Sequence, residues 1–313
     1  LTQVSRGDAA LDDLDLNPIL VRADGEGELV SSRNAPRTEV PDTLDAQMVV
    51  DARLALESGA KMQLSYNVEN TQRAIGTRLS SHIVRRFGMT GLREGHISVR
   101  LRGSAGQSLG AFATKGLRLD VIGDANDYVG KGLSGGMIVV RPSAAVSFVA
   151  SANTIIGNTV LYGATSGKLF AAGQAGERLC VRNSGATAVV EGSGSNACEY
   201  MTGGKVVILG AVGDNFGAGM TGGMAFIYDE AESFAARANM ETLNIFRISH
   251  PHWEAVLRDL IAEHASETES ALAARILNHW DKAVQCFWQV VPTEVVPVLE
   301  MPLSLEQDAA ETA

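Results

Sequence analysis

Cysteine and aromatic residues are both in short supply in this sequence. The three cysteines among its 313 residues are Cys180, Cys198 and Cys286, too few and too scattered to predict a disulfide framework or a zinc cluster. Such usage favours a reducing compartment. Aromatic residues make up 5% of the chain whereas glycine occurs 33 times. The composition therefore favours closely stacked backbone over a bulky globular core.

The charge balance and the hydrophobicity pattern exclude further classes of protein. The chain has 26 Lys and Arg against 36 Asp and Glu, a net charge of −10, which disfavours nucleic-acid binding because that function needs a basic face. No apolar run approaches the length of a membrane span, and the polar stretch 1–13 does not resemble a signal peptide. We therefore expect a cytoplasmic protein with neither nucleic acid nor membrane as a partner. A first residue other than Met, Leu1, suggests a fragment of a longer protein.

Two glycine-rich stretches match the loop that binds dinucleotides. Residues 130–136 read GKGLSGG and residues 217–223 read GAGMTGG, and both fit G-x-G-x-x-G. That loop needs a following helix, whose N-terminus binds the pyrophosphate. Short apolar stretches, 137–140 and 224–228, follow the glycines instead and are typical of buried strands. The sequence therefore predicts corners between strands and no NAD or FAD site.

Glycine also recurs at nearly constant intervals through the middle of the chain. It occupies positions 157, 167, 176, 185, 194, 203, 213 and 222, in steps of nine or ten residues with short apolar stretches between most of them. Two steps form a unit of 18–19 residues. A fixed period with short strands and glycine corners indicates a solenoid. Neither the six-residue step of hexapeptide acyltransferases nor the G-G-x-G-x-D motif of calcium-binding repeats is present. We therefore predict a mainly β fold of the β-helix type.

Other elements are predicted on either side of the glycine repeats. The N-terminal α/β elements are helices over 44–57 and 72–87 and strands over 62–68 and 97–101. Toward the C-terminus, a helix from Pro251 and a capping box, Ser266-x-x-Glu269, predict a helical hairpin that closes the open end of the solenoid or docks on another domain. An extended acidic tail should run from Pro292 to Ala313. The predicted organisation is a linker or extended arm over 1–41, a glycine-repeat domain over 42–230, and a helical segment with tail over 231–313.

Counting from the corner glycines predicts which side chains fill the solenoid. The third and fifth residues after each glycine are apolar and should point inward: Ile138/Val140, Phe170/Ala172, Ala188/Val190, Val206/Ile208 and Ala225/Ile227. The alternate positions include Thr187 and Lys205. Cys180 and Cys198 lie one unit apart and should stack about 4.8 Å from each other as free thiols on one face.

Three groups of polar residues are candidate sites. They are His250 with His252; Asp124, Asn126 and Asp127; and Ser104, Gln107 and Ser108. The histidines form at most half of a metal site, and a helix start explains them more simply. The acidic group is better explained by Asx turns at a corner than by cation binding. The serines lack a paired base. We therefore predict no catalytic, cofactor-binding or metal-binding residue in this chain.

Several glycine segments carry a family resemblance. They are residues 70–76 (NTQRAIG), 103–112 (GSAGQSLGAF) and 123–136 (GDANDYVGKGLSGG), to which residues 263–277 (EHASETESALAARIL) add a helical segment. Together they resemble the C-terminal glycine-repeat (GXGXG) domain of the glutamate synthase large (alpha) subunit, from about residue 14 to residue 299. One departure is Gln72, where the family usually carries an acid.

The resemblance implies a right-handed parallel β-helix with a non-catalytic, structural role between the glutaminase and synthase domains of the same large subunit. The whole enzyme, which serves glutamate biosynthesis and nitrogen assimilation, converts glutamine, 2-oxoglutarate and NADPH into two glutamates. FMN and an iron–sulfur cluster belong to the rest of the large subunit, and FAD and NADPH to a small NADPH-oxidising subunit. The glutaminase needs an N-terminal cysteine and the synthase needs cluster cysteines, so this chain alone is not expected to be an enzyme.

Two alternatives stay open. The same module occurs in a subunit of formylmethanofuran dehydrogenase, so the chain could be an independent β-helix subunit of another redox complex. It could also be a β-helix enzyme, which would need carboxylates or Lys and Arg clustered on one solenoid face.

Overall fold

The computed structural model describes residues 41–304 and the backbone of two short strands that pair antiparallel, β1 (Ile19–Leu20) and β2 (Val30–Ser31). The rest of the predicted arm over 1–41 and the end of the predicted tail lie outside the described residues. The chain divides into two compact units, Leu1–Pro41 and Asp42–Ala313. The other elements described below belong to the second unit.

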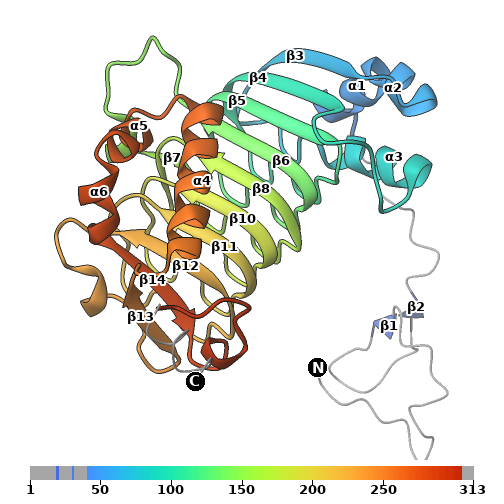
Figure 1. The fold of residues 1–313 in the computed structure, drawn as a ribbon. Helices are drawn as coiled ribbons and strands as arrows, with labels where there is room; N and C mark the ends of the chain where they lie inside the picture. The colour runs from blue at the N-terminus through green and yellow to red at the C-terminus, as the bar shows by residue number, and fades with distance from the viewer. Residues whose placement is uncertain (1–18, 21–29, 32–40, 305–313) are drawn as a thin grey trace, which may run out of the picture. The chain divides into compact units, whose positions relative to one another are not determined.

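A mostly parallel sheet of 12 strands forms the body of this unit (Figure 1). Eight strands pair in parallel in chain order: β3 (Met62–Val68), β4 (Ile97–Ala105), β5 (Leu117–Ala125), β6 (Ser134–Arg141), β8 (Ser166–Ala171), β10 (Ser184–Val190), β11 (Thr202–Ile208) and β12 (Gly222–Tyr228). Then β14 (Phe287–Pro292) pairs antiparallel with β12, and β13 (Leu243–Arg247) with β14. The short β7 (Thr154–Ile156) and β9 (Gln174–Ala175) lie off this path. The prediction of a mainly β fold is confirmed; the described sheet is open, with β3 at one edge and β13 at the other.

The glycines that recur every nine residues fall into two stacked columns. In one column, the backbone N of Gly176 donates to Gly157 O at 3.0 Å, Gly194 N to Gly176 O at 3.1 Å, and Gly213 N to Gly194 O at 3.3 Å. A Cβ atom at Gly213 would lie 2.3 Å from the backbone N of Ser195, so only glycine permits this approach. The second column contains glycines 167, 185, 203 and 222, at or near strand starts. Two glycine steps therefore make one repeat unit, as predicted.

The corners before β5, β6, β8, β10, β11 and β12 are each built from three left-handed residues at alternate positions, which we call a corner triplet. Their φ values lie between 53° and 71°. The six triplets are Ser108/Gly110/Phe112, Tyr128/Gly130/Gly132, Thr159/Leu161/Gly163, Arg178/Cys180/Arg182, Asn196/Cys198/Tyr200 and Asn215/Gly217/Gly219. The second place faces the core, where Leu161, Cys180 and Cys198 are fully buried. The glycines in these corners therefore serve the left-handed turn, which costs other residues free energy.

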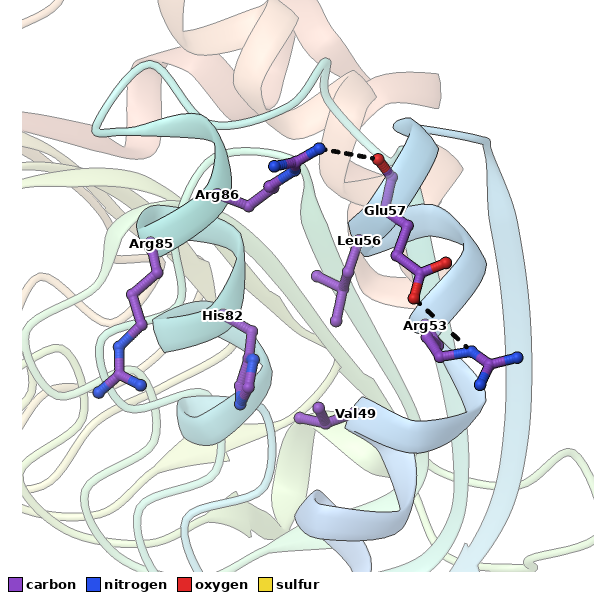
Figure 2. Close-up of a pocket in the computed structure, with 7 residues that line it drawn as sticks. All are labelled: Val49, Arg53, Leu56, Glu57, His82, Arg85 and Arg86. Atoms are coloured by element: carbon purple, nitrogen blue, oxygen red, sulfur yellow. Dashed lines mark hydrogen bonds and ion pairs between the residues drawn. The ribbon is translucent and has the colours of Figure 1, made fainter.

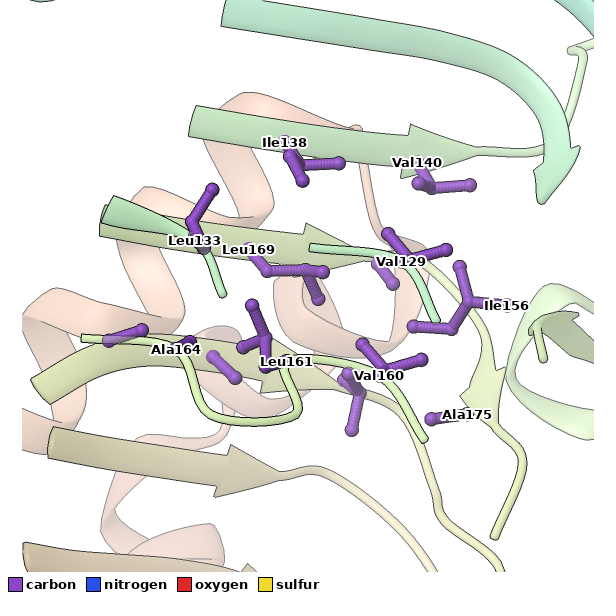
Figure 3. Packing of buried hydrophobic residues seen from close by; sticks show 14 of the residues in the cluster. Val129, Leu133, Ile138, Val140, Ile156, Val160, Leu161, Ala164, Leu169 and Ala175 are labelled. Atoms are coloured by element: carbon purple, nitrogen blue, oxygen red, sulfur yellow. The ribbon is translucent and has the colours of Figure 1, made fainter. Parts of the chain in front are cut away.

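The inner face of the sheet is a single hydrophobic cluster (Figure 3). The predicted inward residues of β6, β10, β11 and β12 all belong to it and are buried. The prediction for Phe170 and Ala172 is wrong by one position: Leu169 and Ala171 point inward, whereas Phe170 belongs to the cluster on the opposite face. The reason is a shorter start of β8, because Ser166 aligns with Ser134 but Lys168 aligns with Met137. One residue is missing between Ser166 and Lys168, and a one-residue shift reverses every side chain that follows.

The C-terminal helices cover the outer face of the sheet. They are α4 (Pro251–Thr268), α5 (Ala271–Asn278) and α6 (Trp280–Ala283), and α4 crosses β6, β8, β10 and β11 (Figure 1). Their apolar residues form a second cluster with outward side chains such as Val189, Val207 and Phe226. The helical hairpin is thus present, but it lies on a face, and the predicted closure of the end is wrong. The end after β12 is instead extended by β14 and β13.

The predicted capping box is also wrong. Ser266 lies inside α4, and the N-cap residue of α5 is Ser270, whose hydroxyl accepts a hydrogen bond from Ala273 N at 3.0 Å. Within residues 41–304 the structure also has four short 3-10 helices: η3 (Ala150–Ala152), η4 (Phe234–Ala236), η5 (Val284–Cys286) and η6 (Val296–Val298). The last of them lies in the tail that was predicted to be extended.

At the other end of the sheet, three helices pack beside β3. The predicted helix 44–57 is two helices, α1 (Leu44–Asp51) and α2 (Arg53–Ser58), with a break at Ala52, and α3 (Thr77–Phe87) begins later than predicted. Asp45 explains that start, because its buried carboxylate accepts hydrogen bonds from Gly76 N at 2.9 Å and Arg78 N at 2.6 Å. Burial raises the pKa of Asp45 despite these bonds. The α1–α3 contact therefore supplies the N-terminal cap of α3.

Candidate functional site

Both glycine motifs lead directly into strands. GKGLSGG runs into β6 and GAGMTGG runs into β12, so the strands predicted after the glycines are confirmed. Gly130 and Gly132, like Gly217 and Gly219, fill the second and third places of corner triplets. A pyrophosphate site of the fingerprint type requires a helix N-terminus at this point. At both motifs the chain instead forms a turn that is followed by a strand of the parallel sheet.

His250 and His252 lie at the start of α4. His250 is the buried N-cap residue, and its Nδ1 accepts a hydrogen bond from the backbone N of His252 at 3.1 Å. The His252 ring packs edge-on against Trp253, with ring centroids 4.7 Å apart. Within residues 41–304, no three His, Cys, Asp or Glu side chains are grouped so that they could hold a metal ion. The pair shapes the helix start, as the sequence favoured.

The side-chain oxygens of Asp124, Asn126 and Asp127 accept hydrogen bonds from residues within the stack of repeat units. Asn126 Oδ1 accepts from Asp127 N at 2.7 Å, and Asp127 Oδ1 accepts from Asn158 N of the next unit at 2.8 Å. Asp124 accepts a hydrogen bond from the Ser104 hydroxyl. The Asn126 contact is local to the corner, like the Asx turns that the sequence favoured, whereas Asp127 and Asp124 bond to residues of neighbouring units.

The serine-containing group belongs to the preceding corner. Ser108 is the first residue of its triplet, and its backbone N donates to Asp127 O at 2.8 Å. The backbone O of Gln107 accepts from Ala74 N at 2.9 Å. The structure therefore brings both polar groups together in neighbouring units, where they link one unit to the next.

A buried polar cluster that the sequence did not reveal joins the helices to the sheet. Glu191, which is 2% exposed and follows β10, accepts a hydrogen bond from the Ser270 hydroxyl. Its Oε1 atom lies 3.6 Å from His264 Nε2, and the fully buried His264 ring lies 6.1 Å from the ring of Phe170. No motif connects these residues, because tertiary packing alone brings them together. The cluster is sealed from solvent, so it can fix the helices but cannot admit a substrate.

An open groove of about 470 Å³ lies between α1–α2 and α3 (Figure 2). Val49 and Leu56 point from one side toward α3 and give the groove an apolar floor. His82, Arg85 and Arg86 line it from α3, and Arg53 and Glu57 line it from α2. The helices are held in place by the apolar contacts of α1 and α2 with Leu79 and Ile83 in the core. We name this site the α1–α3 groove.

The α1–α3 groove is predominantly basic in a chain whose net charge is −10. Its single acid, Glu57, lies 3.8 Å from Arg53 Nε, and the backbone O of Glu57 accepts from Arg86 Nη2 at 3.3 Å. Arg85 and Arg86 are exposed on the last turn of α3. The arrangement suits binding of carboxylates, because an Arg guanidinium presents donors in a planar fork. In the sequence, only the Arg85-Arg86 pair on a predicted helix indicates this groove, and the pair matches no motif.

Comparison with known families decides where the chain belongs. The family model described as "GXGXG motif" matches residues 45–293. The chain belongs to the GXGXG family. The alternating glycines of this GXGXG chain coincide with the second and third places of the corner triplets at residues 130, 132, 217 and 219.

Relatives of this GXGXG chain are glutamate synthases, which confirms the resemblance seen in its sequence. The glutamate synthase [NADPH] large chain of Azospirillum brasilense is 63% identical over 306 residues, covering 97% of this chain and 20% of that protein. The ferredoxin-dependent glutamate synthase of Pyropia yezoensis is 48% identical over 248 residues, covering 79% and 16%. The glutamate synthase [NADH] of Schizosaccharomyces pombe is 43% identical over 298 residues, covering 95% and 14%. The chain thus spans between 14% and 20% of the length of these relatives.

Proposed function

We propose that this chain is a non-catalytic structural domain of an NADPH-dependent glutamate synthase, which holds the glutaminase and synthase domains of the same large subunit in place. The observation that carries the proposal is the use of its polar groups. Asp124, Asp127, His250 and Glu191 all make contacts within the fold, at corners, at a helix start or in a sealed cluster. Accordingly, we propose no catalytic, cofactor-binding or metal-binding residue.

The relatives support the same proposal from another direction. Their names give three electron donors, NADPH, ferredoxin and NADH, yet each is at least 43% identical to this chain over the matched region. A region shared so widely does not distinguish the donors, which favours a structural role common to all of them. We propose NADPH as the donor of this enzyme because the relative with 63% identity is named for it.

We further propose that the parallel sheet is one wall of a right-handed β-helix. Hydrogen bonds between repeat units support this, since they continue outside the sheet through the glycine column and the corner triplets. In this arrangement each unit contacts its two neighbours, as in other solenoids. The division into a glycine-repeat domain over 42–230 and a helical segment over 231–313 stays a prediction.

The remaining parts of the enzyme follow from the same proposal. FMN and an iron–sulfur cluster would lie elsewhere in the large subunit, and FAD and NADPH in the small subunit, which is the second partner besides the catalytic domains. We propose a cytoplasmic location. No helix in the described part of the chain is long and apolar enough to cross a membrane.

The purified chain provides the test. It should be colourless, without flavin or iron–sulfur absorbance, and should release no ammonia from glutamine. Titration calorimetry with NADPH or FAD should give no binding heat. Glutaminase activity, or saturable micromolar NADPH binding that is lost in a folded Gly135→Val variant, would contradict the proposal.

A further inference from the structure

We propose that the open edge of β3 pairs antiparallel with β3 of a second copy of this chain, about a two-fold axis that passes through Ser65. The occupant of this edge is therefore the chain itself, and the sheets of the two copies continue into one another. The inference uses only the edge strand, so it goes beyond the proposed function and does not depend on it.

β3 leaves one side of its backbone unpaired within the described residues. It is the last strand of the described sheet and pairs there with β4 (Figure 1). On the β4 side, Met62 N donates to His96 O at 2.8 Å. Because backbone groups alternate in direction along a strand, Gln63, Ser65 and Asn67 present their N–H and C=O groups to the open edge. Such a row of groups is a template for a further strand.

The composition of β3 does not protect this edge. The strand has seven residues, MQLSYNV, without proline or an internal charge, and its register with β4 runs unbroken from Met62 to Val68. Charges flank the strand only at its two ends, at Lys61 and Glu69. Edges that stay unpaired are typically short, bulged, or interrupted by proline or charge. β3 is therefore suited to accept a partner strand.

The sequence of β3 is complementary to itself. With Ser65 on the axis, each residue faces one of a matching kind in the second copy, and the facing pairs are Lys61/Glu69, Met62/Val68, Gln63/Asn67 and Leu64/Tyr66. Opposite charges and apolar side chains that face each other across antiparallel strands stabilise a sheet. An axis moved by one residue, to Leu64 or Tyr66, would no longer bring Lys61 opposite Glu69. Charge complementarity thus selects both the partner and the register, as a two-fold interface requires.

The environment of the β3 side chains agrees with this arrangement. Lys61 and Glu69 are exposed, and within residues 41–304 neither side chain has a hydrogen-bond or ion-pair partner. On the inner face, Met62, Leu64 and Tyr66 pack against the core yet stay half-buried. A second strand would cover the apolar surface that the core leaves open.

The opposite edge of the sheet provides a contrast. β13 is also an edge strand, and it spans Leu243–Arg247. Pairing of β13 with itself about its middle residue, Ile245, would put Arg247 opposite Leu243 and Phe246 opposite Asn244. Charged and polar side chains would then face apolar ones. Self-pairing is therefore expected at β3 and not at β13.

The test places a thiol on the proposed axis in the full-length protein. Ser65→Cys brings two thiols opposite each other in a hydrogen-bonded pair, where Cα atoms lie roughly 5.5 Å apart, within the roughly 4.4–6.8 Å that a disulfide spans. The matched control is Gln63→Cys, which is also exposed on β3 but lies roughly 14 Å from its own counterpart. We expect mild oxidation to give a covalent dimer severalfold faster with Ser65→Cys than with the control. Mass spectrometry identifies the link, and the protein without a new thiol gives the baseline from its native cysteines.

Charge reversal provides a measurement that does not depend on oxidation. Lys61→Glu and Glu69→Lys each place like charges across the interface, so each should weaken the dimer severalfold in sedimentation equilibrium. The double variant restores opposite charges and should return the dissociation constant to within about twofold of the unchanged protein. Both residues are exposed, so circular dichroism should show that all three variants keep the fold.

Every outcome bears on the second copy as the occupant. No covalent dimer, or equal rates for Ser65→Cys and Gln63→Cys, would overturn the proposal. A link from the new thiol to a different segment would also overturn it and would indicate another strand at this edge. A double charge variant that dimerises no more tightly than the single variants would contradict the register and the proposal with it. The proposed function stands or falls separately, on the absorbance, ammonia and titration measurements of the purified chain.

Discussion

Individual residues in the corner triplets have left-handed backbone angles. Some of their glycines are covered by aromatic side chains from the neighbouring repeat unit. The Phe112 ring lies against Gly132 of the next unit, and the Tyr200 ring lies in the same way against Gly219. A Cβ atom at Gly132 would be 2.5 Å from Phe112 Cε1. The exposed aromatic rings thus cover glycine backbone, which accounts for aromatic residues at a solvent-facing corner.

We predict that Gly132→Ala lowers stability more than Gly163→Ala. Both glycines have φ of 62° and both variants incur the left-handed penalty of roughly 1–2 kcal/mol, but a Cβ at Gly163 meets no atom within 4 Å. The additional loss at Gly132 comes from the collision with Phe112. It should therefore shrink in a Phe112→Ala background, as measured by chemical denaturation in a double-mutant cycle. Equal losses of stability in the two variants would show that the Phe112 ring moves aside at no cost in free energy.

Asp229 gives a prediction about pH. Burial acts to raise its pKa, but hydrogen bonds from Phe234 N at 2.9 Å, Ser233 N at 3.0 Å and Trp288 Nε1 at 3.1 Å outweigh this and leave the pKa below the ordinary value of 3.8. A lowered carboxyl pKa stabilises the fold above the unfolded value and loses that contribution as the pH falls through the folded value. The stability difference between the protein and Asp229→Asn should be constant from pH 7 to about 5 and should narrow below pH 3.8. A difference that stays constant down to pH 3 would refute this assignment.

Residue-level predictions from the sequence succeeded where a local rule decided the outcome. The inward positions of β6, β10, β11 and β12 follow from alternation, whereas the prediction for Phe170 failed because the start of β8 is one residue shorter. The glycine spacing could not reveal this, since Gly167 itself keeps the interval. For the α1–α3 groove the sequence offered one signal, the Arg85-Arg86 pair on a predicted helix, but the other lining residues come from helices that only tertiary packing brings together.

At the level of elements, ion pairs fix the position of α4 on the sheet. Lys168 Nζ on β8 lies 2.5 Å from Glu263 Oε1, and Arg118 on β5 lies 2.6 Å from Glu267 Oε2. Arg141 of β6 lies 3.1 Å from Glu269. The three acidic residues thus lie along one side of α4 and at its C-terminal end. Each faces a basic residue on a different strand of the sheet.

We predict that Lys168→Glu and Glu263→Lys are each destabilising and that the double variant recovers most of the loss. The pair is half-buried, so each single change should cost about 1 kcal/mol, because it places like charges together. Thermal unfolding of the four proteins gives the coupling energy. If the double variant is no more stable than the sum of the singles predicts, the ion pair does not position the helix.

Element boundaries show why part of the fold was beyond sequence analysis. The start of α3 is set by Asp45, a residue of α1 that is distant in sequence. The capping box predicted at Ser266 does not form, because α4 continues past this residue. The buried side chains of Ile261 and His264 pack this part of the helix against the sheet. Strands with clear alternation, such as β3, were predicted to the residue.

For the whole molecule, Cys180 and Cys198 report on the stacking of repeat units. Cys180 N donates to Val160 O at 2.8 Å and Cys198 N to Leu179 O at 2.7 Å, so the two thiols occupy the same place in adjacent units. Burial raises the pKa of both, and the nearby Cys198 raises that of Cys180 further. Thiolate, the reactive form, is therefore scarce at both positions.

We predict that alkylation of the native protein modifies Cys286, which is partly exposed, much faster than the other two cysteines. Cys180 and Cys198 should react only when the units separate, so their rates should rise together with added denaturant, as mapped by mass spectrometry. Val206→Asp, which buries an uncompensated charge on the inner face, should make all three react at once. Independent rates at Cys180 and Cys198 would mean that the units open one at a time.

The covering of the outer face by the last helices has a consequence for biosynthesis. The ribosome completes β6, β8, β10, β11 and β12 before it reaches residue 251, the start of α4. Until then no helix covers the outer face of the sheet, so the nascent chain exposes a hydrophobic surface that includes Phe170, Val189, Val207 and Phe226. Premature termination anywhere in residues 229–250 would leave that hydrophobic surface permanently exposed and should yield an insoluble product. The order of translation therefore makes the C-terminal helices the step that turns a stacked but aggregation-prone intermediate into a finished domain.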